Sequence, residues 1–146
     1  MSFAISQGLR PGDAVVVPKS ELNLIAHYLI YLGINIYGEH VYAENIRVYG
    51  VREINENQFV RENPTYNRIR RMDGNDLGRT QAVKRAKSLI GKEYHLTKFN
   101  CEDYANYVQY NKAFSKQVDV AFGIAGLGLG LALLAALIPS ESGRPR

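Results

Sequence analysis

The feature that most restricts the fold is an apolar stretch near the end of the chain, residues 120–138, which carries no charged or polar side chain. A helix of this length would be about 28 Å long, close to the roughly 30 Å hydrocarbon core of a bilayer. A buried helix of a soluble protein usually keeps a polar stripe, and this stretch has none. The sequence therefore predicts a C-terminal transmembrane helix over residues 120–138, followed by a short polar tail at residues 139–146.

Small residues recur along this predicted helix. Gly126 and Gly130 stand four positions apart, a spacing that lets two membrane helices approach closely, so self-association through this face is one expectation. Two basic residues flank each side of the stretch, and the positive-inside rule therefore gives no orientation. The soluble part of the chain must lie before it.

The composition of the chain excludes several classes of protein. Its length of 146 residues suits one domain, and 46% hydrophobic with 22% charged residues is typical of a globular fold. A single cysteine rules out an intrachain disulfide. The net charge of +4 fits an anionic partner, and beside a membrane helix the expected partner is a phospholipid membrane rather than nucleic acid. The first residues show no secretory signal pattern.

Hydrophobic patterning predicts strands first and helices afterwards. Short β-rich runs occupy residues 13–17, 26–32, 39–43 and 47–51, with a weaker edge strand at 68–72. Helical spacing of apolar residues covers 80–90, with Gly91 placed as a C-terminal cap, and a second helix is expected over 100–114. This order predicts an α+β fold, an antiparallel sheet packed against helices.

The lone thiol, Cys101, falls in the first turn of a predicted helix, directly after Asn100, a favoured N-cap residue. Free amide groups and the helix dipole at this position stabilise a thiolate and lower the pKa of the thiol. Cys101 shares a helix face with Tyr104 and Val108, which should point toward the sheet. Two interpretations stay open, a catalytic nucleophile and an inert buried cysteine.

Three histidines can serve as proton acceptors for such a thiol. His27 lies inside the second predicted strand among apolar residues. His40 begins the next strand, and a hairpin with strands about 4.8 Å apart is expected to bring it beside His27. His95 lies in the loop before Cys101. For each histidine taken singly, a structural role is the simpler interpretation.

Other catalytic patterns are absent from the sequence. No CxxC or HxxxH spacing occurs, so we expect neither a bound metal nor another cofactor. No GxSxG motif marks a serine hydrolase.

Four motifs in order resemble the LRAT-like (lecithin:retinol acyltransferase-like) domain: Arg10-Pro11-Gly12-Asp13, the run from Ala26 to Gly33, the histidine at 40, and Asn100-Cys101-Glu102. That family includes small phospholipase/acyltransferases with a C-terminal membrane helix, and it belongs to the NlpC-like branch of papain-type thiol enzymes in permuted order. The resemblance implies an LRAT-like thiol hydrolase/acyltransferase domain over residues 8–117. It implies that Cys101 is the nucleophile, His27 the general base and His40 the residue that orients His27.

The sequence departs from the family pattern at Asp103 and Tyr104, where a histidine and a phenylalanine are common. The resulting expectation is a membrane-anchored, cysteine-dependent phospholipase A/acyltransferase that acts on acyl-lipid substrates through a thioester. A thiol amidase or peptidase and a non-enzymatic membrane-tethered or membrane-perturbing module are the alternatives. The apolar stretch predicts a single-pass membrane anchor. A lone reactive thiol survives best in a reducing compartment, so we expect the domain to face the cytosol.

Overall fold

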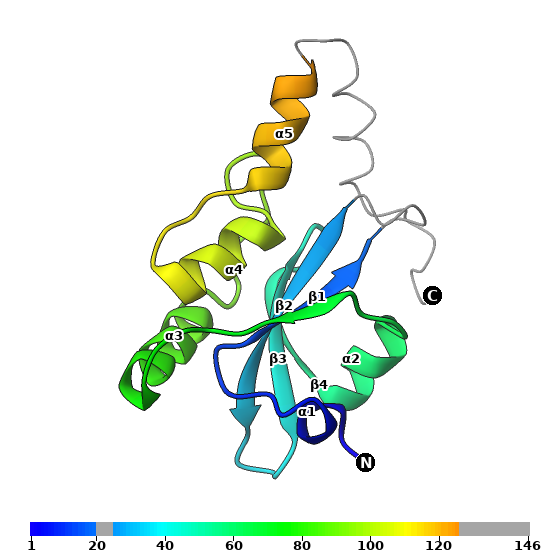
Figure 1. The fold of residues 1–146 in the computed structure, drawn as a ribbon, viewed down its shortest axis with the longest axis vertical. Coiled ribbons are helices and arrows are strands. Elements are labelled where there is room, and N and C mark those ends of the chain that lie inside the picture. The colour runs from blue at the N-terminus through cyan, green and yellow to red at the C-terminus, as the bar shows by residue number, and fades with distance from the viewer. Residues whose placement is uncertain (20–24, 126–146) are drawn as a thin grey trace.

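A five-stranded antiparallel sheet forms the centre of the protein. The structure, a computed structural model, describes residues 1–19 and 25–125. The strands are β1 (Ala14–Pro18), β2 (Ala26–Ile34), β3 (His40–Ile46), β4 (Gly50–Asn55) and β5 (Arg68–Arg70), in the spatial order β4-β3-β2-β1-β5 (Figure 1). Every neighbouring pair is antiparallel. The predicted α+β fold with an antiparallel sheet is confirmed.

Helices cover both faces of the sheet. They are α1 (Phe3–Ser6), α2 (Glu56–Glu62), α3 (Asp76–Ser88), α4 (Cys101–Tyr110) and α5 (Lys116–Ala125). On one face, Tyr28 and Ile30 of β2 pack in one apolar cluster with Tyr104 of α4. On the opposite face, Leu29 of the same strand packs in a cluster with Phe59 of α2. Alternate residues of β2 thus face different helices, as the two-residue repeat of a strand requires.

The turn between β3 and β4 differs from the sequence prediction. A strand was expected over 47–51, but β3 continues to Ile46 and β4 starts at Gly50. Gly50 has a positive φ of 67°, and a Cβ there would lie 2.2 Å from the carbonyl oxygen of Lys92. Val51 donates its N–H to that same oxygen at 2.9 Å. The close approach of two backbones therefore fixes a glycine at the start of β4.

The aspartate of the Pro-Gly-Asp motif before β1 is the centre of a buried hydrogen-bond network. The Asp13 carboxylate is fully buried and accepts hydrogen bonds from the Met72 amide at 2.9 Å and from Arg79 at 2.9 Å on one oxygen. Its other oxygen accepts from Arg71 and from the Arg10 amide, each at 3.0 Å. Burial opposes ionisation of this carboxyl, but these donors outweigh it and lower its pKa. The motif thus ties β1 to the start of α3.

The described part of the C-terminal region ends with α5. The predicted transmembrane helix over residues 120–138 overlaps only the last residues of α5, and residues 126–138, with Gly126 and Gly130, lie outside the described residues, as does the tail at 139–146. Within residues 1–19 and 25–125, no helix has both the length and the apolar character needed to cross a bilayer.

Candidate active site

Cys101 is the first residue of α4, and its position is set by a complete N-terminal cap. The side-chain oxygen of Asn100 accepts from the amides of Glu102 at 2.8 Å and Asp103 at 3.1 Å. Asp103 returns the interaction by accepting from the Asn100 amide at 2.9 Å. This capping box confirms the predicted N-cap and explains why an aspartate fits at position 103.

A second contact fixes the start of α4 to the sheet. Asn45 of β3 is fully buried and donates its side-chain N–H to the carbonyl oxygens of Phe99 at 2.8 Å and Asn100 at 3.2 Å. In the loop just before α4, His95 and Phe99 exchange two backbone hydrogen bonds at 2.9 and 2.8 Å. The His95 ring is exposed and accepts from the Lys98 amide at 3.2 Å, so its contacts shape this loop.

The Cys101 thiol lies at the beginning of β2, beside His27. Its Sγ is 3.8 Å from the carbonyl oxygen of Ala26, and the side chain is 2% exposed. The His27 ring is also buried, and its Nε2 lies 2.6 Å from Oε2 of Glu44 on β3. Among the described residues, Nδ1 of His27 has no hydrogen-bond partner. The geometry therefore brings together a thiol, an imidazole and a carboxylate, with one ring nitrogen left for the thiol.

The charges at this site favour a thiolate and an imidazolium. Burial opposes ionisation of the Cys101 thiol, but the interaction with His27 outweighs it and lowers the pKa of the thiol; Lys19 and the backbone N–H of Tyr28 act in the same direction. Burial also disfavours the charged form of His27, but Cys101 and then Glu44 outweigh it and raise the pKa of His27 to about 9.

Arg52 holds the carboxylate of Glu44 in place. Its Nε and Nη2 donate to Oε1 of Glu44 at 2.9 and 2.7 Å, and Nη2 also donates to Glu62 of α2 at 2.8 Å. Burial opposes ionisation of Glu44, yet His27 and Arg52 together lower the pKa of its carboxyl. Oε2 remains directed at His27, and Glu44 is therefore charged and oriented.

The expected contact between His27 and His40 is wrong. In the register of the β2–β3 pair, His40 lies opposite Ile34, and its Nδ1 is 2.6 Å from the hydroxyl oxygen of Tyr31. His27 and Ile34 are about 23 Å apart along an extended strand. The physical reason is that a hairpin pairs residues by their distance from its turn: His40 follows the turn directly, whereas Glu44, four residues later, lies opposite Leu29.

Sequence reasoning missed Glu44. Regular counting outward from the turn at residues 35–39 would place Glu44 opposite Ile30, on the face of β2 away from His27. The register irregularity between Tyr31 and Gly33 places it opposite Leu29 instead, on the same face as His27.

Residues 7–114 match the family model described as lecithin retinol acyltransferase. The chain belongs to this family. It is 38% identical over 61 residues to Phospholipase A and acyltransferase 3 of Pongo abelii, a match that covers 40% of this chain and 38% of that protein. It is 35% identical over 72 residues to Phospholipase A and acyltransferase 3 of Homo sapiens, covering 46% of this chain and 44% of that protein. The chain thus spans less than half the length of these two relatives.

The region that matches the lecithin retinol acyltransferase family contains every described strand and the helices α2 to α4. A cavity of about 290 Å³ reaches His27 and Glu44 from the β3–β4 side, and Lys19, Arg47 and Arg52 add positive charge to its wall. The described residues contain no group of three or more His, Cys, Asp or Glu side chains arranged to hold a metal ion.

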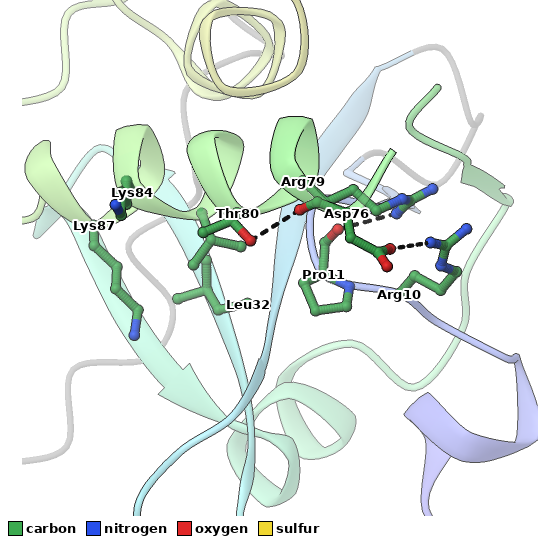
Figure 2. Close-up of a pocket in the computed structure, with 9 residues that line it drawn as sticks. Arg10, Pro11, Leu32, Asp76, Arg79, Thr80, Lys84 and Lys87 are labelled. Atoms are coloured by element: carbon green, nitrogen blue, oxygen red, sulfur yellow. Dashed lines mark hydrogen bonds and ion pairs between the residues drawn. The ribbon is translucent and has the colours of Figure 1, made fainter. Parts of the chain in front are cut away.

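A second pocket, of about 460 Å³, lies between α3 and the far end of β2, where Leu32 lines it (Figure 2). Arg10 forms an ion pair there with Asp76 at 2.8 Å, and Arg79 is paired with Asp13. Leu32 is about 16 Å along the strand from His27. This pocket is therefore separate from the cysteine–histidine site.

Proposed function

We propose that this member of the lecithin retinol acyltransferase family is a lipid-modifying thiol enzyme, a phospholipase A or acyltransferase that forms a thioester on Cys101. The observation that carries the proposal is the buried His27, which donates Nε2–H to the Glu44 carboxylate at 2.6 Å on one side and lowers the pKa of Cys101 on the other. A thiol, a base and a group that orients the base are the parts that nucleophilic catalysis needs. In this proposal Glu44, not His40, is the orienting residue.

In the first step, the Cys101 thiolate attacks the carbonyl carbon of the ester. A carbon–sulfur bond forms, the carbon–oxygen bond to the glycerol breaks, and the departing oxygen takes the proton held by His27. The amides of Glu102 and Asp103 are bound by the Asn100 cap, so the Cys101 amide is the first-turn donor left to stabilise the developing oxyanion.

In the second step, neutral His27 removes a proton from an acceptor, which attacks the thioester carbonyl. The carbon–sulfur bond breaks, and the Cys101 thiolate and protonated His27 are restored. Water as the acceptor gives a free fatty acid, and an amine gives an amide. Through both steps Glu44 accepts the Nε2–H of His27, so that Nδ1 is the ring nitrogen that gives and takes the proton.

The proposed substrate is a glycerophospholipid, because both named relatives are phospholipase/acyltransferases. The apolar sequence at residues 120–138 supports action at a membrane surface, where a bound enzyme meets an insoluble substrate at high effective concentration. We propose a membrane location on this ground, with the domain on the cytosolic side.

The proposal is tested by intact mass of the full chain in detergent after incubation with phosphatidylcholine vesicles. We expect an acyl-sized mass increase that hydroxylamine removes and that Cys101→Ser lacks. Thr97→Ser, a small change in the loop before α4, serves as the matched control and should still form the adduct. Lipid cleavage that continues undiminished in Cys101→Ser would overturn the proposal.

A further inference from the structure

A third cavity, of about 360 Å³, opens beside the cysteine–histidine site. Tyr28, which follows His27 in the sequence, and Glu102, which follows Cys101, both line it. Arg68 and Arg70 contribute from β5, and Lys116 contributes from the first turn of α5. Neither His27 nor Cys101 lines the cavity, but it lies against the residue that follows each of them and against the helix that leads into the apolar sequence.

Arg70 in this cavity forms no ion pair with a carboxylate within the part of the chain that the structure describes, and Glu102 acts on it only without direct contact. Its Nε donates to the amide oxygen of Gln109 at 2.6 Å and its Nη1 to that of Asn106 at 2.8 Å, and both partners are neutral. Its Nη2 is buried and has no hydrogen-bond partner among the same residues. The guanidinium lies 4.9 Å from the ring centre of Tyr28 and 5.3 Å from that of Tyr110.

Two other arginines with largely buried side chains have carboxylate partners. Arg79 is paired with Asp13, and Arg52 is paired with Glu44 and Glu62. Burial lowers the pKa of Arg70. An oriented, partly desolvated cation without an ion-pair partner is costly, so its retention points to an anion that joins it from outside.

The surrounding charges agree with an anionic ligand. Arg68 and Lys116 form no ion pair among the described residues. The only carboxylate in the lining, Glu102, is already bound, because its Oε2 accepts from the Ser115 hydroxyl at 2.7 Å and from the Gln117 amide at 3.0 Å. The lining thus offers three cations against one engaged carboxylate.

The position of the cavity points to a lipid rather than a free anion. Tyr110 and Phe114 stack at 6.2 Å and are partly exposed at its mouth, and aromatic rings of this kind are common at membrane surfaces. Gln117 of α5 accepts from the Ala26 amide at 2.8 Å, so the start of α5 is fixed next to His27. A lipid held here would have its headgroup beside the site.

We infer that this cavity binds the phosphate of a phospholipid headgroup through Arg68, Arg70 and Lys116 and so selects phosphate-bearing esters for Cys101. The inference rests on the proposed function for its catalytic consequence. Guanidinium and ammonium groups bind phosphate oxygens by charge-assisted hydrogen bonds, and aromatic faces accommodate the attached group.

The test compares two monomeric substrates of the full chain in nonionic detergent: a short-chain phosphatidylcholine and an uncharged short-chain ester. For the variant Arg68→Gln/Lys116→Gln, whose altered side chains are exposed, we expect kcat/KM to fall about tenfold or more on the phospholipid and to stay within about twofold on the neutral ester. Arg70→Gln should show the same selectivity.

The matched control, Arg61→Gln/Lys87→Gln, removes the same charge from exposed positions of α2 and α3 and should leave both substrates unaffected. Equal losses on both substrates, or no loss on the phospholipid, would overturn the inference.

A binding experiment separates this inference from the proposed chemistry. Cys101→Ser protein is titrated with the short-chain phosphatidylcholine, with the matching uncharged diacylglycerol and with inorganic phosphate, and chemical shifts are followed by NMR. We expect the phospholipid to bind and the cavity variant to weaken it about tenfold or more, even if no enzyme form is ever acylated. Equal binding of the diacylglycerol would contradict recognition of phosphate, and equal binding of inorganic phosphate would contradict a lipid source.

Discussion

His27 is buried, and the two nitrogens of its ring have different surroundings. One nitrogen faces Glu44 at 2.6 Å, and the other is left for Cys101. A carboxylate at this place fixes the tautomer and stabilises the imidazolium, which is the part an orienting residue plays in a triad. His40 lies on β3 opposite Ile34, at the far end of β2 from His27, and its ring contacts Tyr31 instead.

Replacement of Glu44 separates these two residues experimentally. We expect Glu44→Gln to lower kcat/KM for acyl transfer about 100-fold, since the ring loses both its orientation and its counter-charge. His40→Asn is the matched control and should change the rate by less than about twofold, because its ring contacts the hydroxyl of Tyr31 at the end of the β2–β3 pair away from His27. A larger loss in His40→Asn than in Glu44→Gln would contradict the assignment.

The pH dependence of the rate follows from the same pair. The active form needs the Cys101 thiolate and protonated His27, so the rate should rise at low pH as the thiol ionises and fall as His27 loses its proton near pH 9. In Glu44→Gln the alkaline fall should move to lower pH, because the carboxylate that raises the pKa of His27 is gone. An alkaline limb that does not move in this variant would count against Glu44.

Among the secondary-structure elements, the start of α4 does most to position the side chains of the site. The capping box around Asn100 and the bonds from Asn45 set the position of Cys101 against β2. The cap also directs the positive end of the helix dipole at the thiol, which favours the thiolate.

Removal of the cap should affect both stability and the thiol. We expect Asn100→Ala to lower the free energy of unfolding by about 1 kcal/mol in a denaturant titration and to raise the pKa of Cys101. Asn75→Ala is the matched control, because Asn75 caps α3 in the same way by accepting from the Gly78 amide at 2.9 Å. It should cost similar stability while the pKa of Cys101 stays constant.

The elements that the sequence predicted are those with strong local signals. The Asn100 cap and the apolar run of β2 are local patterns, and both are present in the structure. The helix α2 was missed, since its signals are only the Asn55 cap and one buried residue, Phe59. The partner of His27 was missed for a different reason: strand register depends on the turn and on the irregularity between Tyr31 and Gly33, which alternation alone does not reveal.

At the scale of the whole molecule, Asp13 connects β1 with the segment before α3 and with α3 itself. Its carboxylate accepts from Arg79, from Arg71 and from two backbone amides while fully buried. Breaking a buried charge pair leaves the remaining arginine without its partner. The motif that helped to reveal the family therefore has a structural role in this chain.

Substitution of Asp13 should destabilise the entire domain. We expect Asp13→Asn to lower the free energy of unfolding at neutral pH by about 3 kcal/mol, against less than about 0.5 kcal/mol for the exposed Asp73→Asn. The folded-state pKa of Asp13 lies below its unfolded value of 3.8, so its contribution is present above about pH 4 and is lost as the pH falls through the lower value. Acid titrations of stability should therefore be less steep in Asp13→Asn than in the wild type.

The pH titration of the thiolate by its ultraviolet absorbance, with Cys101→Ser subtracted, tests whether His27 and Glu44 activate Cys101. Because the chain has one cysteine, the signal belongs to Cys101 alone. We expect a transition below the ordinary thiol pKa in the wild type and a transition at or above it in His27→Gln, where burial then dominates. An ordinary thiol pKa in the wild type, or the same transition in both proteins, would show that His27 does not activate Cys101.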